Sequence, residues 1–380
     1  MTGARADLES RLRRVWDEGG EAPAALSVAL TVASAGYRGA LALRERLYRL
    51  GMLRSRRLSC PVISIGNLTL GGSGKTPVAA LAVSTLQALG ARPAVVSRGY
   101  GRHSRGLRVV SDRAGIRLRA REGGDEPVLL AERLPGVPVV VGESRYEAGR
   151  VAVERLGADA VVVDDGYQHR ALHKDLEVLV VGGREPWGNG RLFPRGRLRE
   201  PLTAIGRAHL VVVTNATATV RDVAATIRRH NDRAPLVSAG YELEGVRRAG
   251  AEAAQPGARV AGHRLLAFAG LASPRGFAET VAATGAGAIG LVEFPDHHWY
   301  TARELAELAE RARAGGAEGL ITTEKDWVRI RDLSLPPVAL WVVSVSMSLR
   351  SGAGAWHEAL ARVWTSAATP GAGGRARNPV

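Results

Sequence analysis

Residues 61–76 read PVISIGNLTLGGSGKT, and this stretch decides the fold. The short apolar run at 62–65 is typical of a buried β-strand. It breaks into a glycine-rich turn that ends in GKT at 74–76, and a helical pattern follows over 78–89. The order of strand, loop and helix is typical of a loop that binds nucleotide phosphates, because glycines let backbone amides approach the phosphate oxygens closely.

This loop supplies the residues that we expect to bind ATP. Lys75 would reach the β- and γ-phosphates, and the Thr76 hydroxyl would hold Mg²⁺. The usual motif has a glycine six residues before the lysine, where this chain has Thr69. Because GKT also occurs by chance, an ordinary glycine-rich turn is the alternative interpretation, and the flanking strand and helix favour nucleotide binding. The predicted nucleotide-binding residues are Gly71, Gly72, Ser73, Gly74, Lys75 and Thr76.

Lysine is rare in this chain. Of 52 lysine and arginine residues, only Lys75, Lys174 and Lys325 are lysine. Arginine cannot imitate the compact charge of lysine inside a tight phosphate-binding loop. Retention of lysine at position 75 therefore indicates a chemical need, and the same argument singles out Lys325 and, with less support, Lys174.

The overall composition limits the classes of function. A chain of 380 residues predicts two domains, and a formal net charge of +15 predicts an anionic partner such as nucleic acid, phospholipid headgroups or a phosphorylated substrate. Cys60 is the only cysteine, which excludes an intrachain disulfide and fits a reducing cytoplasm. We recognise no signal peptide, and no run reaches the roughly 20 apolar residues of a transmembrane helix.

Residues 23–50 predict an amphipathic helix, because apolar residues recur at steps of three and four from Leu26 to Leu41. Arginines are frequent in its second half and just beyond it. A basic amphipathic helix can lie in a membrane interface and attract anionic lipids. The alternative is a helix packed on the main domain, and the pattern alone does not choose between the two.

After the loop, apolar strands alternate regularly with helices, which predicts a parallel sheet covered on both faces. We therefore predict an α/β protein in which a three-layer, P-loop NTPase-like kinase core occupies 61–240. An N-terminal region with the amphipathic helix precedes it at 1–60, and a smaller α/β domain follows at 241–365. Residues 366–380 predict a disordered tail.

Three further segments give expectations that a structure can check. The long loop at 183–207 is rich in glycine, proline and arginine, and loops of this length are usually functional or disordered. Trp187 argues for an ordered loop. Residues 242–263 predict a linker or a hairpin. A helix is predicted at 301–314, with Thr301 as its N-cap.

Carboxylates lie where metal ligands are expected. Asp164 and Asp165 come directly after an apolar strand, and ligands bind at the carboxyl ends of parallel strands. Two adjacent carboxylates there would be costly without a cation. We favour a metal site, and the alternative is an Asp-Gly turn with Asp165 in solvent.

Other polar residues are individually weaker candidates. Asp125 begins a predicted helix, so an N-cap is its simplest role. His297 and His298 point different ways, but one of them could form an acid–base pair with a carboxylate across a domain cleft. Residues 168–169 could line the pocket beside Asp165. The sequence TEKD at 323–326 lies just past a strand, where it could touch nucleotide.

Together these stretches resemble the bacterial tetraacyldisaccharide 4′-kinase family, the lipid A 4′-kinases. The resemblance covers about residues 25–365, and Thr69 supports it because the family also lacks the first glycine of the usual loop. The stretches that carry it are IGNLTLGGSGKTP (65–77), SRGYG (97–101), GGDEP (123–127), DDGYQHR (164–170), LHKDLE (172–177), GNGRLFPRGRLREP (188–201), FAGLASPRGF (268–277), FPDHHWYT (294–301) and TEKD (323–326).

The resemblance implies transfer of the γ-phosphate of ATP, with Mg²⁺, to the 4′-hydroxyl of a tetraacylated glucosamine disaccharide 1-phosphate, a late step of lipid A biosynthesis. It implies that Asp125 accepts the hydroxyl proton with His297 as its partner. Metal and acceptor carboxylates would be Asp164, Asp165 and Glu200. The acceptor-site residues that it implies are Arg145, Gln168, His169 and Arg199.

The family's N-terminal helix lies on the inner membrane, so the resemblance favours the membrane for residues 23–50. It implies a peripheral protein on the cytoplasmic face, whose partners are an acylated disaccharide phosphate lipid and the membrane surface. The sequence does not indicate the oligomeric state.

Two other classes of protein compete with the kinase. A P-loop switch or metallochaperone-type NTPase would need a guanine-reading motif such as N/T-K-x-D, and residues 323–326 have the wrong spacing for it. A nucleic-acid-binding protein would need clustered basic residues with interleaved aromatics. The arginines are scattered and aromatic content is 5%, so we expect no nucleic-acid partner.

Overall fold

The computed structural model describes residue 16 and residues 23–215, 220–251, 260–272 and 274–368. The described residues contain one sheet of thirteen strands, in the order β11-β10-β12-β13-β9-β8-β7-β1-β6-β2-β5-β3-β4. Its strands are β1 Val62–Gly66, β2 Pro93–Ser97, β3 Arg108–Asp112, β4 Gly115–Ile116, β5 Val139–Val141, β6 Ala160–Asp164, β7 Leu176–Gly182, β8 Leu210–Thr214, β9 Leu236–Arg248, β10 Arg264–Ala269, β11 Gly287–Glu293, β12 Gly319–Thr323 and β13 Ala339–Ser351.

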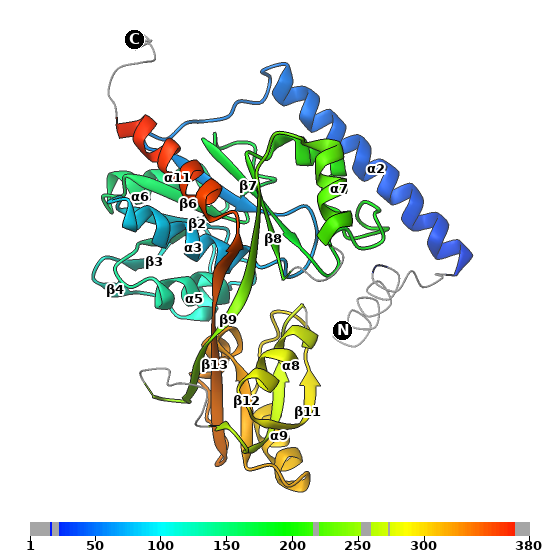
Figure 1. Cartoon of the computed structure of the whole chain (residues 1–380), viewed down its shortest axis with the longest axis vertical. Coiled ribbons are helices and arrows are strands. Elements are labelled where there is room, and N and C mark those ends of the chain that lie inside the picture. The colour runs from blue at the N-terminus through cyan, green and yellow to red at the C-terminus, as the bar shows by residue number, and fades with distance from the viewer. Residues whose placement is uncertain (1–15, 17–22, 216–219, 252–259, 273, 369–380) are drawn as a thin grey trace.

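The helices cover the sheet and extend beyond it, and Figure 1 shows them arranged in two lobes. They are α2 Ala24–Arg49, α3 Lys75–Ala88, α4 Ala120–Gly123, α5 Asp125–Arg133, α6 Arg145–Glu154, the 3₁₀ helix η1 Leu202–Arg207, α7 Val220–His230, α8 Pro274–Ala283, α9 Ala302–Ala314, α10 Glu324–Ile330 and α11 Ala353–Ala368.

The larger lobe, here called the core lobe, is built on the parallel strands β5, β2, β6, β1, β7 and β8. These strands are mostly apolar and are buried, as expected for a parallel sheet with helices on both faces. Helices α3, α5 and α11 pack on one face, and α6, η1 and α7 pack on the other. The predicted alternation of strands and helices is confirmed.

The smaller lobe contains β10, β11, β12 and the first part of β13, which are parallel to one another. Helices α9 and α10 cover one face of these strands, and α8 covers the other. The N-terminus of α9 confirms one local prediction. Thr301 forms a capping box with Glu304, whose backbone N–H donates to the Thr301 hydroxyl at 3.2 Å.

Two long strands connect the lobes. Strand β9 is parallel to β8 at its start and antiparallel to β13 from Ser238 to Arg248. In Figure 1 this two-stranded ribbon runs from the core lobe into the smaller lobe. The prediction of a linker or hairpin at 242–263 is wrong for residues 242–248, which are strand; residues 252–259 lie outside the described part of the chain.

Helix α11 brings the chain back to the core lobe. The Trp356 indole donates to the Thr85 hydroxyl of α3 at 2.9 Å, and Trp356 and Leu360 are fully buried in the core cluster. The smaller lobe is therefore inserted between β9 and β13, and the predicted domain at 241–365 is wrong at its C-terminal end. Residues 366–368, predicted as disordered, are helical, and residues 369–380 lie outside the described part.

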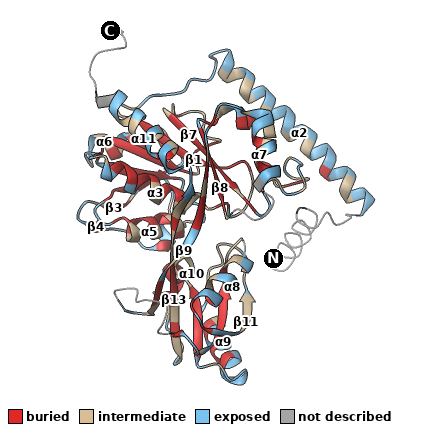
Figure 2. Cartoon of the chain, in the orientation of Figure 1, coloured by how far each residue is buried: buried red, intermediate tan, exposed pale blue. Residues whose placement is uncertain are grey.

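Helix α2 confirms the helix predicted at 23–50 and lies along the outside of the core lobe (Figure 1). It is joined there by the Tyr37 hydroxyl, which donates to the carbonyl of Arg199 at 2.8 Å, and by Ser34, which donates to the carbonyl of Leu192. Figure 2 shows that most of the helix remains exposed. By length and composition it could cross a membrane, which corrects the expectation that no stretch of the chain would do so.

Candidate active site

The glycine-rich loop between β1 and α3 is tightly packed. Gly74 caps α3 with a φ of 82°, a conformation that favours glycine. A Cβ atom added there would lie 3.3 Å from the Met347 side chain of β13 and 3.5 Å from the Tyr241 hydroxyl of β9. The Thr214 hydroxyl donates to the carbonyl of Ser73 at 2.8 Å. The loop is thus held between the sheet and the ribbon that joins the lobes.

Helix α3 begins at Lys75, three residues before the predicted start. The Lys75 ammonium lies 3.3 Å from the Asn67 side-chain oxygen and 3.6 Å from an Asp165 oxygen. The Thr76 hydroxyl donates to an Asp164 oxygen at 3.2 Å. Strands β1 and β6 are neighbours in the sheet, so the loop and the two aspartates meet at the same carboxyl edge.

The two aspartates have opposite electrostatic environments. Asp164 is 1% exposed and its Oδ1 atom has no hydrogen-bond partner among the described residues. Burial, and then the nearby charges of Glu126 and Asp165, raise the pKa of Asp164 to about 7. Burial also acts on Asp165, but Lys75 and Arg199 outweigh it and hold the pKa of Asp165 at about 2. Asp165 is therefore an ionised, paired carboxylate, whereas Asp164 lacks a cationic partner in contact.

The hydroxyl of Thr76 and the unpartnered oxygen of Asp164 are hard oxygen donors of the kind that Mg²⁺ prefers. A divalent cation there would also offset the cost of burying the Asp164 charge. The described residues contain no group of three or more histidine, cysteine or acidic side chains placed for a metal. The remaining ligands of a bound ion would therefore be water and phosphate oxygens, which is common for Mg²⁺.

Glu200 makes a separate set of contacts. One of its oxygens accepts from Arg44 of α2 at 2.6 Å and the other accepts from Arg207 at 2.6 Å. These contacts attach α2 to the core lobe. The role of Glu200 as a metal ligand stays a prediction.

Asp125 and His297 come from different lobes and meet. Asp125 is the first residue of α5, and His297 lies in the loop after β11, with a φ of 58°. Nδ1 of His297 is 2.8 Å from Oδ2 of Asp125, whose Oδ1 accepts the backbone N–H of Glu126. Gly124, not Asp125, is the N-cap of α5, so the simplest alternative role for Asp125 does not apply.

The environment of Asp125 keeps it ionised. The carboxylate is 3% exposed, and Arg329 lies 3.3 Å from it. Burial alone would raise the pKa of Asp125, but the hydrogen bond from His297 and the charges of Lys325 and Arg329 outweigh burial and lower it. The exposed ring of Tyr100 lies against His297, with ring centroids 5.2 Å apart.

Lys325 extends this cluster. Its ammonium lies 2.9 Å from Glu126, 3.1 Å from Asp296 and 3.4 Å from Nε2 of His297. Burial would lower the pKa of Lys325, but these carboxylates outweigh it and raise the pKa. The third lysine, Lys174, donates to the carbonyls of Gly166 and Tyr167 in the turn after Asp165. All three lysines thus contact the candidate site or the turn that supports it.

The four predicted acceptor-site residues lie around the aspartates. Arg199 donates to both oxygens of Asp165, at 3.0 and 2.8 Å, and Gln168 donates to the carbonyl of Asn67. Arg145 is buried, contacts the Glu143 carbonyl, and has an Nε without a partner in the described structure. Burial, with Arg145 and Lys174 nearby, lowers the pKa of His169 to about 4, so this side chain is neutral.

Sequence reasoning missed several residues of the cluster. Asn67, Glu126 and Asp296 each lie within a stretch that was singled out, so their positions near the glycine-rich loop, Asp125 and His297 in the sequence were a usable signal. Arg329 has no such signal, because only the fold of α10 brings it to Asp125. Tyr241 is likewise placed over the loop by β9, which the sequence did not predict.

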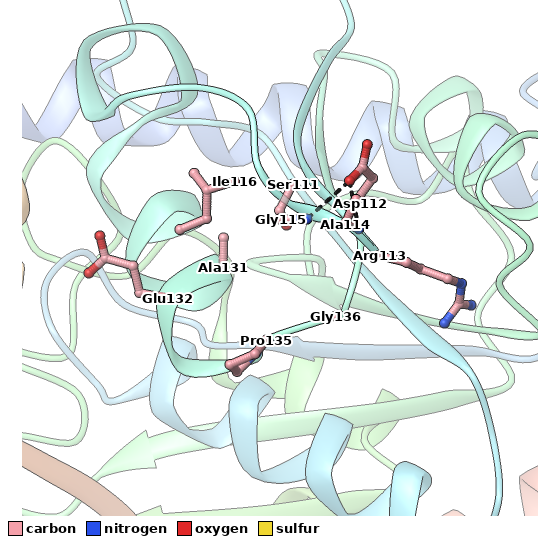
Figure 3. A pocket seen from close by; sticks show the side chains of 10 residues that line it. All are labelled: Ser111, Asp112, Arg113, Ala114, Gly115, Ile116, Ala131, Glu132, Pro135 and Gly136. Carbon is pink, nitrogen blue, oxygen red and sulfur yellow. Dashed lines mark hydrogen bonds between the residues drawn. The ribbon is translucent and has the colours of Figure 1, made fainter. Parts of the chain in front are cut away.

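A pocket elsewhere in the core lobe does not compete with this site. Figure 3 shows it between the edge strands β3 and β4 and the end of α5. Its carboxylates are already used: Asp112 accepts from the amides of Ala114 and Gly115, and Glu132 pairs with Arg331. We assign no function to this pocket. The lining residues are Ser111, Asp112, Arg113, Ala114, Gly115, Ile116, Ala131, Glu132, Pro135 and Gly136.

The glycine-rich loop, its lysine and the carboxylates that contact it at the sheet edge are those expected of an α/β kinase that uses ATP. Comparison with known proteins gives the family. A family model described as tetraacyldisaccharide-1-P 4′-kinase (LpxK) matches residues 26–364. The chain belongs to this family, whose activity is ATP-dependent 4′-phosphorylation in lipid A synthesis.

Curated relatives and a solved structure agree. The chain is 45% identical over 365 residues to a tetraacyldisaccharide 4′-kinase of Anaeromyxobacter dehalogenans, covering 93% of this chain and 95% of the relative. It is 39% identical to the Syntrophus aciditrophicus enzyme of the same name, over 90% of this chain and 96% of the relative. The crystal structure of LpxK from Aquifex aeolicus in complex with ATP superposes with a TM-score of 0.71 at 29% identity, covering 89% of this chain and 99% of that one. The predicted family, kinase activity and use of ATP are confirmed.

The raised pKa of Asp164 leads to a testable stability effect. The pKa of Asp164 in the folded chain, about 7, exceeds its ordinary value of 3.8, because burial favours the neutral carboxyl. The contribution of this neutral side chain to the free energy of unfolding is fully present below about pH 4. It is lost as pH rises through 7 and the buried carboxyl ionises. In metal-free buffer we therefore expect Asp164→Asn to be more stable than the unmodified chain at pH 8 and similar to it near pH 4. Denaturant unfolding across this range measures the difference.

Addition of Mg²⁺ provides the control. It should remove the deficit of the unmodified chain at pH 8 and leave the Asp164→Asn variant unchanged, because the variant lacks the charged ligand. A stability difference that stays constant from pH 4 to pH 8 would contradict a pKa raised by burial.

Proposed function

We propose that this chain transfers the γ-phosphate of ATP to the 4′-hydroxyl of a tetraacylated glucosamine disaccharide 1-phosphate, with Mg²⁺, on a P-loop NTPase-like core. The observation that carries the proposal is the Asp125–His297 pair, which joins the two lobes in the same charged cluster as Lys325, Glu126 and Asp164. Such an arrangement brings an acid–base group to a phosphate-binding loop, which is what transfer to a hydroxyl requires.

The donor half of the site binds and orients ATP. Amides of the glycine-rich loop and the N-terminus of α3 face the phosphates, and Lys75 neutralises the charge that develops on them. Thr76 and Asp164 would hold Mg²⁺, which supplies charge neutralisation at the phosphate oxygens when bound. The paired Asp165 is not free for this role, because Arg199 and Lys75 already occupy it.

The Asp125–His297 pair handles the proton. In the reaction the 4′-oxygen bonds to the γ-phosphorus, the bond from that phosphorus to the bridging oxygen of ADP breaks, and the hydroxyl proton leaves. Both oxygens of Asp125 are hydrogen-bonded in the buried end of the site, so the two residues accept the proton as a coupled unit. Lys325 and Arg329 stabilise the negative charge of that unit.

The acceptor half of the site suits a phosphorylated sugar. Among the described residues, Arg145 is a buried guanidinium with no carboxylate in hydrogen-bond contact, and a buried cation of this kind is usually paired. Arg199 contacts Asp165, and His169 lies near enough to Arg145 for that charge to lower its pKa. We propose that Arg145, Gln168, His169 and Arg199 bind the disaccharide and its anionic group.

The direct test is transfer of ³²P from labelled ATP to purified tetraacyl disaccharide 1-phosphate in detergent, compared with the same reaction without acceptor. Labelled lipid that forms only with acceptor would support the kinase. Phosphate release that is unaffected by acceptor would instead favour a switch-type NTPase, the alternative function.

We further propose that the protein is peripheral on the cytoplasmic face of the inner membrane, with α2 as its contact. The exposed side of α2 carries Val28, Val32 and Leu43, each about 60% exposed, together with several arginines. The other side is attached to the core lobe through Tyr37 and Arg44. An apolar face flanked by arginines matches an interfacial helix that meets anionic lipids.

Substitution of the exposed valines tests this membrane contact. We expect Val28→Asp with Val32→Asp to lower binding to anionic vesicles at least about tenfold, because two charges would enter the lipid interface. Sedimentation with vesicles measures the bound fraction. Ile116→Asp, at an exposed apolar position on the edge strand β4, is the matched control and should bind normally. Unchanged binding of the double variant would place the membrane contact elsewhere.

A further inference from the structure

Helices α5 and α10 face each other across the junction of the two lobes, and their charged side chains pair in both directions. Glu126 accepts from Lys325, Glu132 pairs with Arg331, and Arg133 pairs with Glu324. The α5 helix supplies two acids and one base, whereas α10 together with its C-cap residue Arg331 supplies one acid and two bases. These three contacts are here called the inter-lobe ion pairs.

The inter-lobe ion pairs are more sheltered than ordinary surface pairs. The side chains of Glu132 and Arg331 are 23% and 25% exposed, and those of Arg133 and Glu324 are 22% and 17% exposed. Isolated exposed pairs contribute little, but partly buried pairs in one network are screened less by solvent. Elsewhere in the smaller lobe, Arg303 and Glu307 of α9 form a pair that is 88% and 61% exposed.

The contact between Asp125 and His297 lies at the same junction. Asp125 is the first residue of α5, whereas His297 belongs to the smaller lobe and lies 3.4 Å from Lys325, the second residue of α10. A shift of α10 along α5 would therefore move His297 relative to Asp125. Apart from such side-chain contacts, the covalent connection between the lobes is the ribbon of β9 and β13.

We propose that the Glu132–Arg331 and Arg133–Glu324 pairs are positioning contacts that dock the smaller lobe on α5 and so set the distance between Asp125 and His297. Neither pair contacts the residues assigned to ATP or acceptor. Their effect on the reaction passes through the geometry of the acid–base pair. This inference rests on the proposed role of Asp125 and His297.

Charge reversal and exchange test the Glu132–Arg331 pair. We expect Glu132→Arg to lower kcat by about tenfold, because two guanidinium groups would repel each other across the junction and misplace His297. The double variant Glu132→Arg with Arg331→Glu should recover kcat to within about threefold. Arg247 lies near this pair, and the exchange keeps one carboxylate among two guanidinium groups.

The distance between the lobes gives a readout that does not depend on activity. Cysteines introduced at the exposed positions Glu154 of α6 and Ala306 of α9 can carry spin labels. Burial raises the pKa of the native Cys60 thiol to about 12, so labelling at neutral pH favours the introduced thiols. We expect Glu132→Arg to broaden the distance distribution and the exchange to narrow it again. Circular dichroism checks that each variant is folded.

Glu307→Arg is the matched control, since it makes the same substitution at an exposed pair of the smaller lobe, away from the junction. It should change neither kcat nor the distance distribution. An unchanged distance distribution between the spin labels in folded Glu132→Arg would overturn the proposal, whether or not Asp125 and His297 act as the acid–base pair. A broadened distance with unchanged kcat would also overturn it, because positioning would not limit transfer. Failure of the unmodified chain to phosphorylate the acceptor would instead count against the proposed function.

Discussion

Replacement of Lys75 by alanine is expected to lower the kcat of phosphate transfer by about a thousandfold, with the protein still folded. Lys75 is the only lysine at the glycine-rich loop in the described structure. Its ammonium contacts Asn67 and Asp165 where the phosphates would bind. Loss of that charge leaves the developing negative charge of the transferred phosphate without its main protein partner. Steady-state transfer of labelled phosphate measures the effect.

Lys75→Arg separates charge from shape. Arginine keeps the positive charge, but its planar guanidinium cannot reproduce the compact ammonium that lies beside Asn67 and Asp165, so we expect a severe loss here as well. Arg92→Ala is a suitable control, because Arg92 forms an exposed pair with Asp159 at the opposite end of β2. Near-normal kcat in folded Lys75→Ala would refute the assignment of the loop.

The second large effect is expected at the acid–base pair. Asp125→Ala should lower kcat by about 10²- to 10⁴-fold, because proton transfer from the acceptor hydroxyl loses its base. His297→Ala should have a similar effect. Since the two side chains act as one unit, the double variant should be hardly worse than either single variant. Rates at saturating ATP and acceptor test this comparison.

Asp125 is also a buried charge beside Arg329, so its removal affects folding as well as chemistry. Asp125→Asn keeps the volume and one hydrogen-bond acceptor, and thermal unfolding of both variants separates stability from catalysis. Asp159→Ala, which removes a partly exposed carboxylate far from the site, provides the matched control. Additive losses in the double variant would show that Asp125 and His297 act independently.

Much of the core lobe could be predicted from the sequence because its strands are short apolar runs buried on both faces. That pattern depends only on neighbouring residues, as does the capping box at Thr301. Strand β9 was missed because its residues are a mixture of buried, partly buried and exposed positions. The short helix α10 was missed because seven residues give too few turns for a helical period.

The return of the chain to the core lobe could not be predicted in the same way. It depends on the contact of Trp356 with Thr85, which are 271 residues apart in sequence. No local pattern contains such a contact. The C-terminal boundary of the smaller domain was therefore placed by chain order. Chain order cannot indicate that the last helix returns to the first lobe.

The site shows the same division. The glycine-rich loop and the two aspartates were found from residue type and position at strand ends, and they are in contact in the structure. The meeting of Asp125 with His297 was expected only from the family resemblance, because 172 residues separate them. Glu200 entered the prediction only through the family resemblance, because nothing in the local sequence indicates that Arg44 and Arg207 contact it.

The position of α11 also affects how the protein is made on the ribosome. Domains usually fold as they emerge, starting from the N-terminal one. Here the apolar side of α3 is covered by Trp356 and Leu360, so the first lobe to be translated stays incomplete until the inserted lobe and residues 353–368 have followed. During that interval the nascent chain exposes a surface that chaperones and proteases recognise. Premature termination within the smaller lobe would thus yield a chain marked for degradation rather than an ATP-binding fragment.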